Sequence, residues 1–364
     1  MAAPVELIDD AIAEILLRLP PDEPACLVRA SLVCKPWRRI LSDPAFIRRY
    51  REFHRSPPLL AFLHNIYDDG SIARIVPTTS PSPFSQPALD CRNWWIVECR
   101  HGRALLNSFD RLAPTGLIVW DPITGEQQHV PVPEYPDLYY TAAVLCGSEG
   151  CHHLDCHGGP FLVVFVGTHH EEDTDVTWAS IYSSETSTWS PSISIQLDSY
   201  IEERPSLLTG GALYFSLEQG KRILKLDLVR HGLCVIDAPD VYEQPEGIVV
   251  TAEDGGLGFA GVKDGSLYLW SGQVSPDGIA GWVQGRVIKL KTLLPILGPL
   301  ASLHVIGFVE GTDIIFMSTD IGVFTIMLKS EQVRKVGERG SYYAIVPYMS
   351  FYTPDLAKGR LTST

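Results

Sequence analysis

The side chains with the most chemical potential lie together in CGSEGCHHLDCH, residues 146–157. The candidate ligands in this segment are Cys146, Cys151, Cys156, His152, His153 and His157. A zinc ion bound in a tetrahedron takes four such sulfur and nitrogen ligands, and a loop of this length could supply them. The spacing matches no standard zinc knuckle, however, and we expect Cys146 to face the packed side of a strand. The alternative, which we favour, is a hairpin loop of reduced thiols and polar histidines.

Two further segments carry residues of chemical interest. THHEEDTDV, residues 168–176, combines histidines with carboxylates that could serve acid–base catalysis, but an acidic hairpin loop has the same composition. Gly256, Gly258 and Gly261 match the dinucleotide fingerprint, which needs a helix after it, whereas a strand-like sequence follows here. No G-x-S-x-G, Walker or H-E-x-x-H motif is present. We therefore expect no catalytic residue, no bound metal and no cofactor.

The composition excludes several classes of protein. The net charge of −14, from 29 Lys+Arg and 43 Asp+Glu, is opposite to what binding to nucleic acid requires. The apolar runs are too short to span a bilayer, and the acidic N-terminal segment is unlike a secretory signal. Eight cysteines in such a chain favour reduced thiols over a disulfide framework. We expect a soluble intracellular protein, cytoplasmic or nuclear, without a nucleic-acid or membrane partner.

The elements that must position these residues change in character near residue 58. Before it, apolar residues recur at steps of three and four along residues 7–19, which predicts an amphipathic helix that ends at Pro20. Three more short helices are predicted, and the last two open at Pro36 and Pro44. So small a bundle carries more large apolar side chains than it can bury. The pattern indicates either a cap packed on the next domain or a docking module for a partner.

Residues 7–46 resemble the F-box family. The shared features are the Leu–Pro end of the first helix, a Val–Cys–basic–x–Trp run and a final Asp–Pro–x–Phe, formed by Leu19, Pro20, Val33, Cys34, Lys35, Trp37, Asp43, Pro44 and Phe46. Ile8 departs from the pattern, because many members have proline there. The resemblance implies docking on the S-phase-kinase-associated linker subunit of a cullin–RING ubiquitin ligase. The implied contact residues are Leu7, Ile8, Ile12, Ile15, Leu19, Pro20, Val33, Cys34 and Trp37, with Trp37 as the expected hot spot.

From residue 57 on, alternation of apolar and polar residues replaces helical periodicity. Short strands are separated by turn residues every 8–12 positions, and no helix-length segment intervenes. The strands group in fours; the first two groups are 94–100, 103–108, 117–120 and 128–132, then 142–146, 161–167, 177–182 and 189–195. Three more groups begin near residues 206, 248 and 305, and strands left over at both ends would pair to close a ring. This predicts a mainly β fold with a small all-α N-terminal module, the β part being a six-bladed β-propeller, with seven blades as the alternative.

The β region is also similar to the propeller-type domain that follows the F-box in many grass-family plant F-box proteins. The matching segments are VWDPITGE, IYSSETSTW, AEDGGLGFAGV with LYLWS, and TDIGVFTIMLKS with VPYMSFYTP. The expected domains are an F-box domain at 1–56 and a propeller at 57–364. Together the two resemblances imply a non-catalytic substrate-recognition subunit of an SCF-type ubiquitin ligase, joined through the linker to a cullin. The alternatives are an F-box scaffold outside a ligase and a propeller enzyme with a helical cap.

Alternate loops of four-strand meanders share one rim of a propeller, and this brings several acidic loops with tyrosines together. The candidate target-binding residues there are Tyr135, Tyr139, Glu171, Glu172, Asp173, Tyr242 and Glu243. Carboxylates beside tyrosines suit a basic segment of a target protein, which charge would attract and aromatic contact would hold. The alternative is that the acidic residues only keep the loops soluble.

Overall fold

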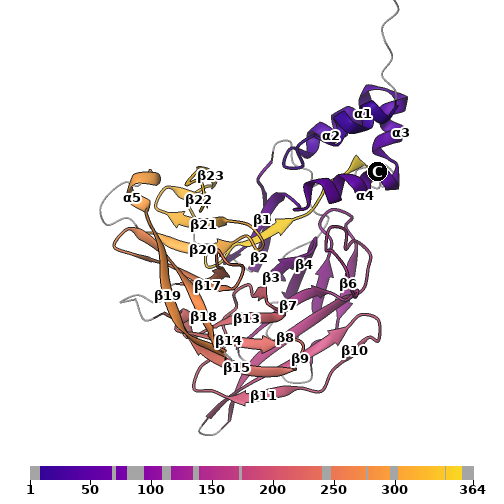
Figure 1. Ribbon diagram of the computed structural model, residues 1–364. Coiled ribbons are helices and arrows are strands. Elements are labelled where there is room, and N and C mark those ends of the chain that lie inside the picture. The colour runs from indigo at the N-terminus through magenta and orange to yellow at the C-terminus, as the bar shows by residue number, and fades with distance from the viewer. Residues whose placement is uncertain are drawn as a thin grey trace, which may run out of the picture.

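The described part of the chain forms four short helices followed by six small β-sheets (Figure 1). The computed structural model describes residues 9–67, 71–79, 94–108, 116–133, 139–171, 174–239, 247–275, 278–295, 302–340 and 342–354. The four N-terminal helices are α1 (Asp9–Leu16), α2 (Pro24–Val33), α3 (Lys35–Leu41) and α4 (Pro44–His54). No helix within these ranges is both long and apolar enough to cross a bilayer.

Proline residues mark the starts of three of these helices. Pro24, Pro36 and Pro44 each stand in the first helical turn, where a missing N–H loses no intrahelical hydrogen bond. Asp43 caps α4, because its side chain accepts from the backbone N of Ala45 at 2.9 Å. The predicted helix starts at Pro36 and Pro44 are therefore confirmed.

The six sheets are the blades of a propeller. The sheet that closes the ring is called the first blade, and the others are numbered in chain order. The first blade has the order β2 (Ser71–Pro77), β1 (Leu59–Tyr67), β24 (Val346–Met349). The second blade is β3 (Trp94–Arg100), β4 (Arg103–Ser108), β5 (Leu117–Trp120), β6 (Gln127–Val130), and the third is β7 (Tyr139–Cys146), β8 (Phe161–Glu171), β9 (Thr174–Ser183), with β10 (Thr188–Trp189) and β11 (Ile193–Gln196) both paired to β9. The fourth is β12 (Leu207–Thr209), β13 (Ala212–Leu217), β14 (Arg222–Asp227), β15 (Gly232–Asp237), with the short helix η1 (Glu218–Gly220) between β13 and β14. The fifth is β16 (Ile248–Thr251), β17 (Leu257–Lys263), β18 (Ser266–Ser275), β19 (Gly278–Lys289), and after α5 (Leu290–Leu293) the sixth is β20 (His304–Phe308), β21 (Ile314–Thr319), β22 (Gly322–Met327), β23 (Val333–Gly337).

Apolar side chains fill each of the six spaces between neighbouring blades. Strand β7 shows how this is achieved. Its Ala142 and Val144 pack against the second blade, whereas Ala143 and Leu145 pack against the fourth. Successive side chains of a strand point to opposite faces, so a strand between two other blades must be apolar on both faces. The described strands therefore form a ring of six blades, as predicted, and the seven-blade alternative is wrong.

The ring closes because strands from the two ends of the β region pair with each other. β1 runs antiparallel to β24, with Phe62 opposite Pro347 and Leu63 opposite Val346. In Figure 1 the yellow strand β24 lies beside the purple strand β1. The prediction that strands from both ends of the β region pair to close the ring is confirmed.

The strand predictions differ from the structure at one instructive place. Residues 189–195 were expected to form one strand, but the structure has β10 and β11 with a break at 190–192. Pro191 lies in this break, and a proline has no N–H to donate to the neighbouring strand. Both short strands still pair with β9, so the edge of the blade is preserved around the proline.

His64 of β1 is a titratable group enclosed in the first blade. Its side chain is only 6% exposed and lies between the rings of Phe62 and Tyr342, whose centroids are 6.1 and 4.8 Å away. Burial lowers the pKa of His64 to about 4, whereas the unfolded chain has a histidine pKa of about 6.5. Between these two values the unfolded chain binds a proton that the folded protein does not. The free energy of unfolding therefore decreases as the pH falls from about 6.5 to about 4.

We predict that a His64→Gln variant loses part of this sensitivity to acid. The difference in pKa corresponds to about 3 kcal/mol once the pH has reached 4. The decrease in unfolding free energy between neutral pH and pH 4 should shrink by that order, as measured by urea denaturation at both pH values. An equal decrease in the variant and in the wild type would contradict the assignment.

Candidate functional site

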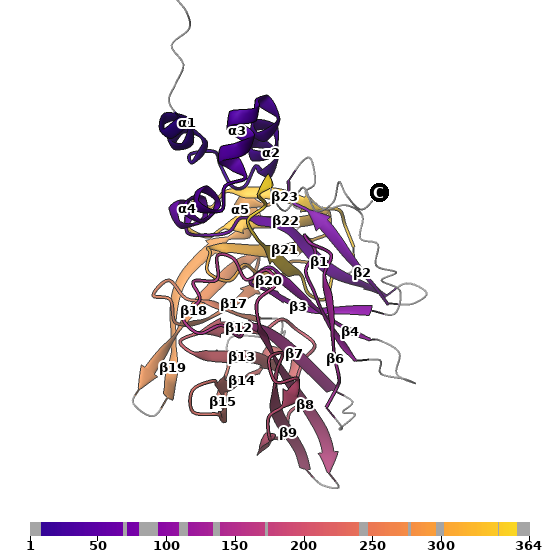
Figure 2. The same cartoon turned by 90° about the vertical axis from the view of Figure 1, so that its right-hand side faces the viewer.

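The helical domain is joined to the propeller through a shared apolar core. Phe351, just past β24, and Leu154, in the loop between β7 and β8, pack among the buried side chains of the helices. Tyr50 of α4 meets the Phe351 ring edge-on, with centroids 6.1 Å apart. Beside this contact Arg51 forms an ion pair with Asp155 of the same loop. Figure 2 shows the helices at one end of the propeller, with the tip of β8 and β9 at the opposite end.

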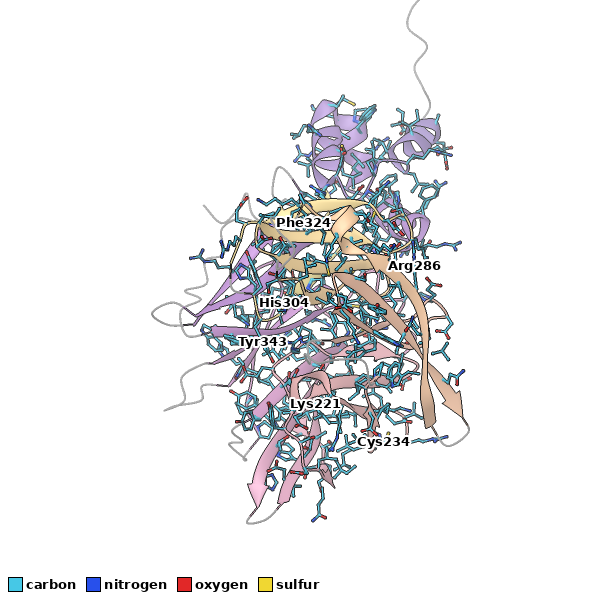
Figure 3. All side chains as sticks on the ribbon, turned by 90° about the vertical axis from the view of Figure 1, so that its left-hand side faces the viewer. Lys221, Cys234, Arg286, His304, Phe324 and Tyr343 are labelled. Atoms are coloured by element: carbon cyan, nitrogen blue, oxygen red, sulfur yellow. The ribbon has the colours of Figure 1, made fainter. Side chains whose placement is uncertain are left out.

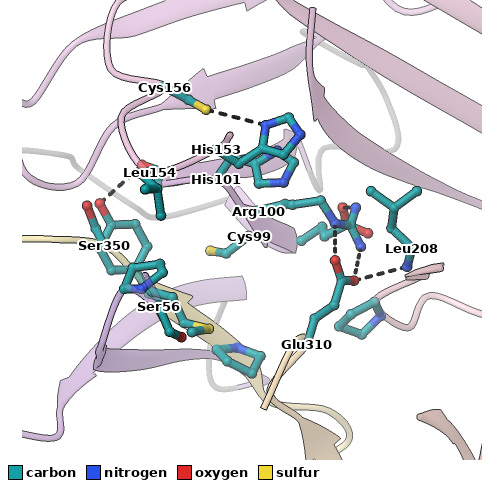
Figure 4. A pocket seen from close by; sticks show the side chains of 18 of the residues that line it. Ser56, Cys99, Arg100, His101, His153, Leu154, Cys156, Leu208, Glu310 and Ser350 are labelled. Carbon is teal, nitrogen blue, oxygen red and sulfur yellow. Dashed lines mark hydrogen bonds and ion pairs between the residues drawn. The ribbon is translucent and has the colours of Figure 1, made fainter. Parts of the chain in front are cut away.

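Below the helices, the central channel of the propeller opens into a cavity of about 510 Å³ (Figure 4). Its walls come from the inner strands β3, β12 and β24, from the end of β20 and from the β7–β8 loop. The rings of His101 and His153 stack in the wall, with centroids 3.9 Å apart and planes inclined by 9°. Burial lowers the pKa of His101 to about 3, so this imidazole is neutral at physiological pH.

A buried network of charges lies beside the cavity on the propeller axis. Glu98 and Arg100 of β3 are 1% and 7% exposed and form an ion pair. Arg100 also donates from Nη2 to Glu310 Oε2 at 2.8 Å and from Nε to Glu310 Oε1 at 3.2 Å, as Figure 4 shows for this pair. Although burial opposes it, the carboxylates of Glu310 and Glu98 raise the pKa of Arg100, so the guanidinium stays charged.

The same network connects four blades. Glu98 accepts from the backbone N of Val144 in β7 at 3.2 Å and from the backbone N of Ser206, just before β12, at 3.1 Å. Glu310, just past β20, accepts from the backbone N of Leu208 in β12 at 3.0 Å. The second, third, fourth and sixth blades are thus bonded to one another where their inner strands converge.

A set of exposed apolar side chains lies on the outer surface of the helical domain. Leu32 and Val33 at the end of α2 are 75% and 63% exposed, and Cys34, which follows them, is exposed as well. Ile15 of α1 is 53% exposed. Large apolar side chains that a small domain leaves in water are typical of a surface that binds a partner.

The structure separates the predicted linker-contact residues into three groups. The exposed ones are Ile15, Pro20, Val33 and Cys34. Ile12, Leu19 and Trp37 are partly buried against the helical core, and their contact with the linker stays a prediction. Leu7 and Ile8 lie outside the described residues. Leu32 was missed, although its place directly before the Val33–Cys34 pair of the motif could have indicated it.

The rim at the opposite end of the channel carries tyrosines. Tyr139 at the start of β7 is 48% exposed and stacks on Tyr200, with centroids 4.8 Å apart. Tyr343, labelled in Figure 3, is 46% exposed, and the Arg204 guanidinium lies 4.6 Å from its ring centroid. Sequence reasoning named Tyr139 as a binding residue of this rim but did not name Tyr200, Arg204 or Tyr343.

Tyr135, Glu172, Asp173, Tyr242 and Glu243 lie outside the described residues, and of Glu171 only the backbone, at the end of β8, is described. The acidic character of the rim therefore stays a prediction.

Two stretches of the chain match known families. Residues 6–49 match the F-box domain, and residues 95–356 match the family described as "F-box protein AT5G49610-like, beta-propeller". The chain belongs to this family of F-box proteins. The predicted resemblance to plant F-box proteins is thereby confirmed.

Curated relatives of this F-box protein are plant proteins of the same kind. An F-box/kelch-repeat protein of Arabidopsis thaliana is 24% identical over 216 residues, which are 58% of this chain and 51% of the relative. An F-box protein of Arabidopsis thaliana is 24% identical over 280 residues, 72% of this chain and 64% of the relative. The match thus spans between half and two thirds of the length of these relatives. Among solved structures, TolB from Acinetobacter baumannii aligns over 84% of this chain and 72% of its own, with 11% identity and a TM-score of 0.41.

We predict that an Arg100→Met variant of this F-box protein is strongly destabilised. Removal of the guanidinium leaves the Glu98 and Glu310 carboxylates without their cation, and breaking a buried charge pair lowers the free energy of unfolding by about 3–5 kcal/mol. Chemical denaturation measures the loss. Arg230→Met, at an exposed position between β14 and β15, is the matched control and should change stability by less than about 0.5 kcal/mol. Equal stability of the two variants would show that the network is not important.

Proposed function

We propose that this protein is the substrate-recognition subunit of an SCF-type cullin–RING ubiquitin ligase. The F-box binds the S-phase-kinase-associated linker protein and through it a cullin, and the propeller binds a target protein. The observation that carries the proposal is the set of exposed apolar side chains, Ile15, Leu32, Val33 and Cys34, on an F-box that shares its core with a propeller.

The physical basis of docking is the burial of these side chains. Full burial of a fully exposed valine, leucine or isoleucine contributes about 1.5–3 kcal/mol, and these side chains, which are half to three quarters exposed, each contribute part of that. A few well-buried residues commonly carry most of the binding energy of an interface. The shared core then sets where the propeller lies relative to the linker, since Leu154 and Phe351 hold the two parts together.

The protein itself contributes proximity rather than catalysis. A bound target is held at high effective concentration near a conjugating enzyme that another subunit carries. We place the division between the F-box domain and the propeller domain after residue 56, and the site of action in the cytoplasm or the nucleus, where such ligases and their targets meet.

We predict that the double variant Ile15→Asp with Val33→Asp loses linker binding but keeps its fold. Both side chains are more than half exposed, so aspartate stays hydrated in the free protein but would be buried in an apolar interface. The affinity for purified linker protein, measured by calorimetry, should fall at least about 100-fold, which corresponds to roughly 2.7 kcal/mol. Trp37 is unsuited to this test because it packs against the helical core.

The control for the linker experiment is Val229→Asp, which places the same charge on an 80% exposed valine of the propeller. It should bind the linker like the wild type. Normal binding by the double variant would refute the docking surface. Linker binding without recovery of a cullin from cell extract would favour the alternative of an F-box scaffold outside a ligase.

We further propose that the rim farthest from the F-box binds the target through its tyrosines. Tyr139 and Tyr343 present aromatic rings on two different connections of this rim. From the sequence we expect Glu171, Glu172, Asp173 and Glu243, with Tyr135 and Tyr242, on the same rim. A target segment rich in lysine and arginine suits such a surface.

The target surface can be tested with an array of peptides that contains basic and acidic sequences. We predict that wild-type protein prefers basic peptides, that salt weakens the binding, and that Tyr139→Ala with Tyr343→Ala lowers it at least about tenfold, or 1.4 kcal/mol. Val229→Ala, on the F-box side of the ring, should leave peptide binding unchanged. Binding that neither salt nor the tyrosine variants affect would place the target site elsewhere.

A further inference from the structure

Four potential metal ligands meet at the joint between the F-box and the propeller. The sulfur atoms of Cys146, Cys151 and Cys156 and one ring nitrogen of His153 all lie within 4.8 Å of one another. Cys156 Sγ lies 3.7 Å from Cys151 Sγ and 3.7 Å from Nδ1 of His153, a contact visible in Figure 4.

These separations are those between the corners of a tetrahedral zinc site. Zinc bonds of about 2.3 Å to sulfur and 2.0–2.1 Å to nitrogen place two sulfurs about 3.8 Å apart, and a sulfur and a nitrogen about 3.6 Å apart. Both 3.7 Å contacts fit this geometry, and the widest separation requires only a small contraction of the loop. A disulfide between Cys151 and Cys156 would instead need sulfurs at about 2.05 Å.

The chemistry of the four residues selects the metal. Three thiolates and one imidazole are a ligand set of structural zinc sites, and soft sulfur ligands disfavour magnesium and calcium. The backbone N of His153 points at Cys151 Sγ at 3.4 Å, a hydrogen bond that stabilises a thiolate. The His101 ring, stacked on His153, holds the imidazole plane in place.

The two other histidines of the segment are placed differently. The side chain of His152 is exposed and is not part of the cluster. His157 shares a hydrogen bond of 2.5 Å between its Nδ1 and Asp121 Oδ2, and its Nε2 lies 3.3 Å from Ser350 Oγ. The fold therefore selects four of the six candidate ligands from the sequence.

We propose that Cys146, Cys151, His153 and Cys156 bind a structural zinc ion. Four protein ligands complete the tetrahedron, so the ion has no open position for a substrate. Binding releases the protons of the three thiols. The site replaces our expectation from the sequence that no metal is bound.

The cluster lies in the loop that contacts the helices, so a bound ion would stabilise that contact. Leu154 and Asp155, which contact the helices, stand between the ligands His153 and Cys156. Cys146 anchors the other side of the site to the end of β7. A zinc ion therefore fixes the part of the loop that carries the F-box.

The test is the metal content of the full-length protein, purified under reducing conditions and dialysed against a mild chelator. Elemental analysis should find one zinc per chain, and replacement with Co²⁺ should give the visible absorption of a tetrahedral cobalt–thiolate centre. His153→Gln and Cys151→Ser should retain at least tenfold less metal. These positions are chosen because they are more exposed than the buried Cys156, so the variants keep their fold.

Two control variants alter the same residue types outside the cluster. His152→Gln replaces the neighbouring exposed histidine, and Cys234→Ser replaces an exposed cysteine on the outer strand β15 (Figure 3); both should bind one zinc. Removal of zinc from the wild type should accelerate proteolytic cleavage within residues 147–160, but not in His153→Gln, which is already sensitive.

Three results would overturn the proposal. The first is wild-type protein that takes up neither zinc nor cobalt. The second is metal binding by His153→Gln and Cys151→Ser equal to that of the controls. The third is a Cys151–Cys156 disulfide in the native protein, detected as an intact mass lower by two hydrogens.

Discussion

The pairing of β1 with β24 is the contact on which the rest of this molecule depends. It joins residues about 280 positions apart in sequence, and the two apolar spaces on either side of the closing blade exist only because this pair closes the ring. The same pair places Phe351 beside Tyr50, and just past it Ser350 donates its backbone N–H to Pro58 O at 3.3 Å. The strand pair that closes the ring therefore also positions the residues that contact the F-box.

The propeller uses two kinds of interaction for two purposes. Between blades, apolar side chains supply most of the stability, because burial of apolar surface is favourable regardless of direction. On the axis, Glu98, Arg100 and Glu310 form directional bonds that are weak as a source of stability, since desolvation offsets their attraction. Their role is to fix how the inner strands of four blades converge, and they define the wall of the cavity below the helices.

Local patterns in the sequence predicted the fold well, because strands between blades must be apolar on both faces. The bounds of β3, β4 and β5 agree with those predicted, and the strands left unpaired at the two ends revealed the closing blade. Side chains in equivalent local settings were harder to assign. Tyr139 and Tyr343 are exposed, but their neighbours Tyr140 and Tyr342 point inward. Tyr140 stacks on Phe165, and Tyr342 lies against the His64 ring with the two planes tilted by 58°. A pair of tyrosines at a strand end does not itself show which of the two faces water.

The F-box and the thiol cluster also contain residues whose contacts could not be predicted from the local sequence. Trp37 matches the motif, and its part in linker binding stays a prediction. The motif did not indicate that this side chain is also partly buried against the helical core. The cysteine and histidine spacing matched no known zinc motif because the loop takes its shape from distant residues. Arg103 donates to the carbonyl oxygens of Cys156 and Gly159 at 2.5 Å each, and Asp121 binds His157. Contacts of this kind are absent from any local pattern.

The shared core also has a consequence for how the protein is made. Synthesis proceeds from the N-terminus, so the four helices leave the ribosome before the blades. Their aromatic partner Phe351 follows only after all the blades have been translated, and Leu154 arrives midway. A nascent or truncated chain that lacks Phe351 therefore leaves Tyr50 and its apolar neighbours without part of their core. The core of the F-box is therefore complete only after the strand that closes the ring has been made.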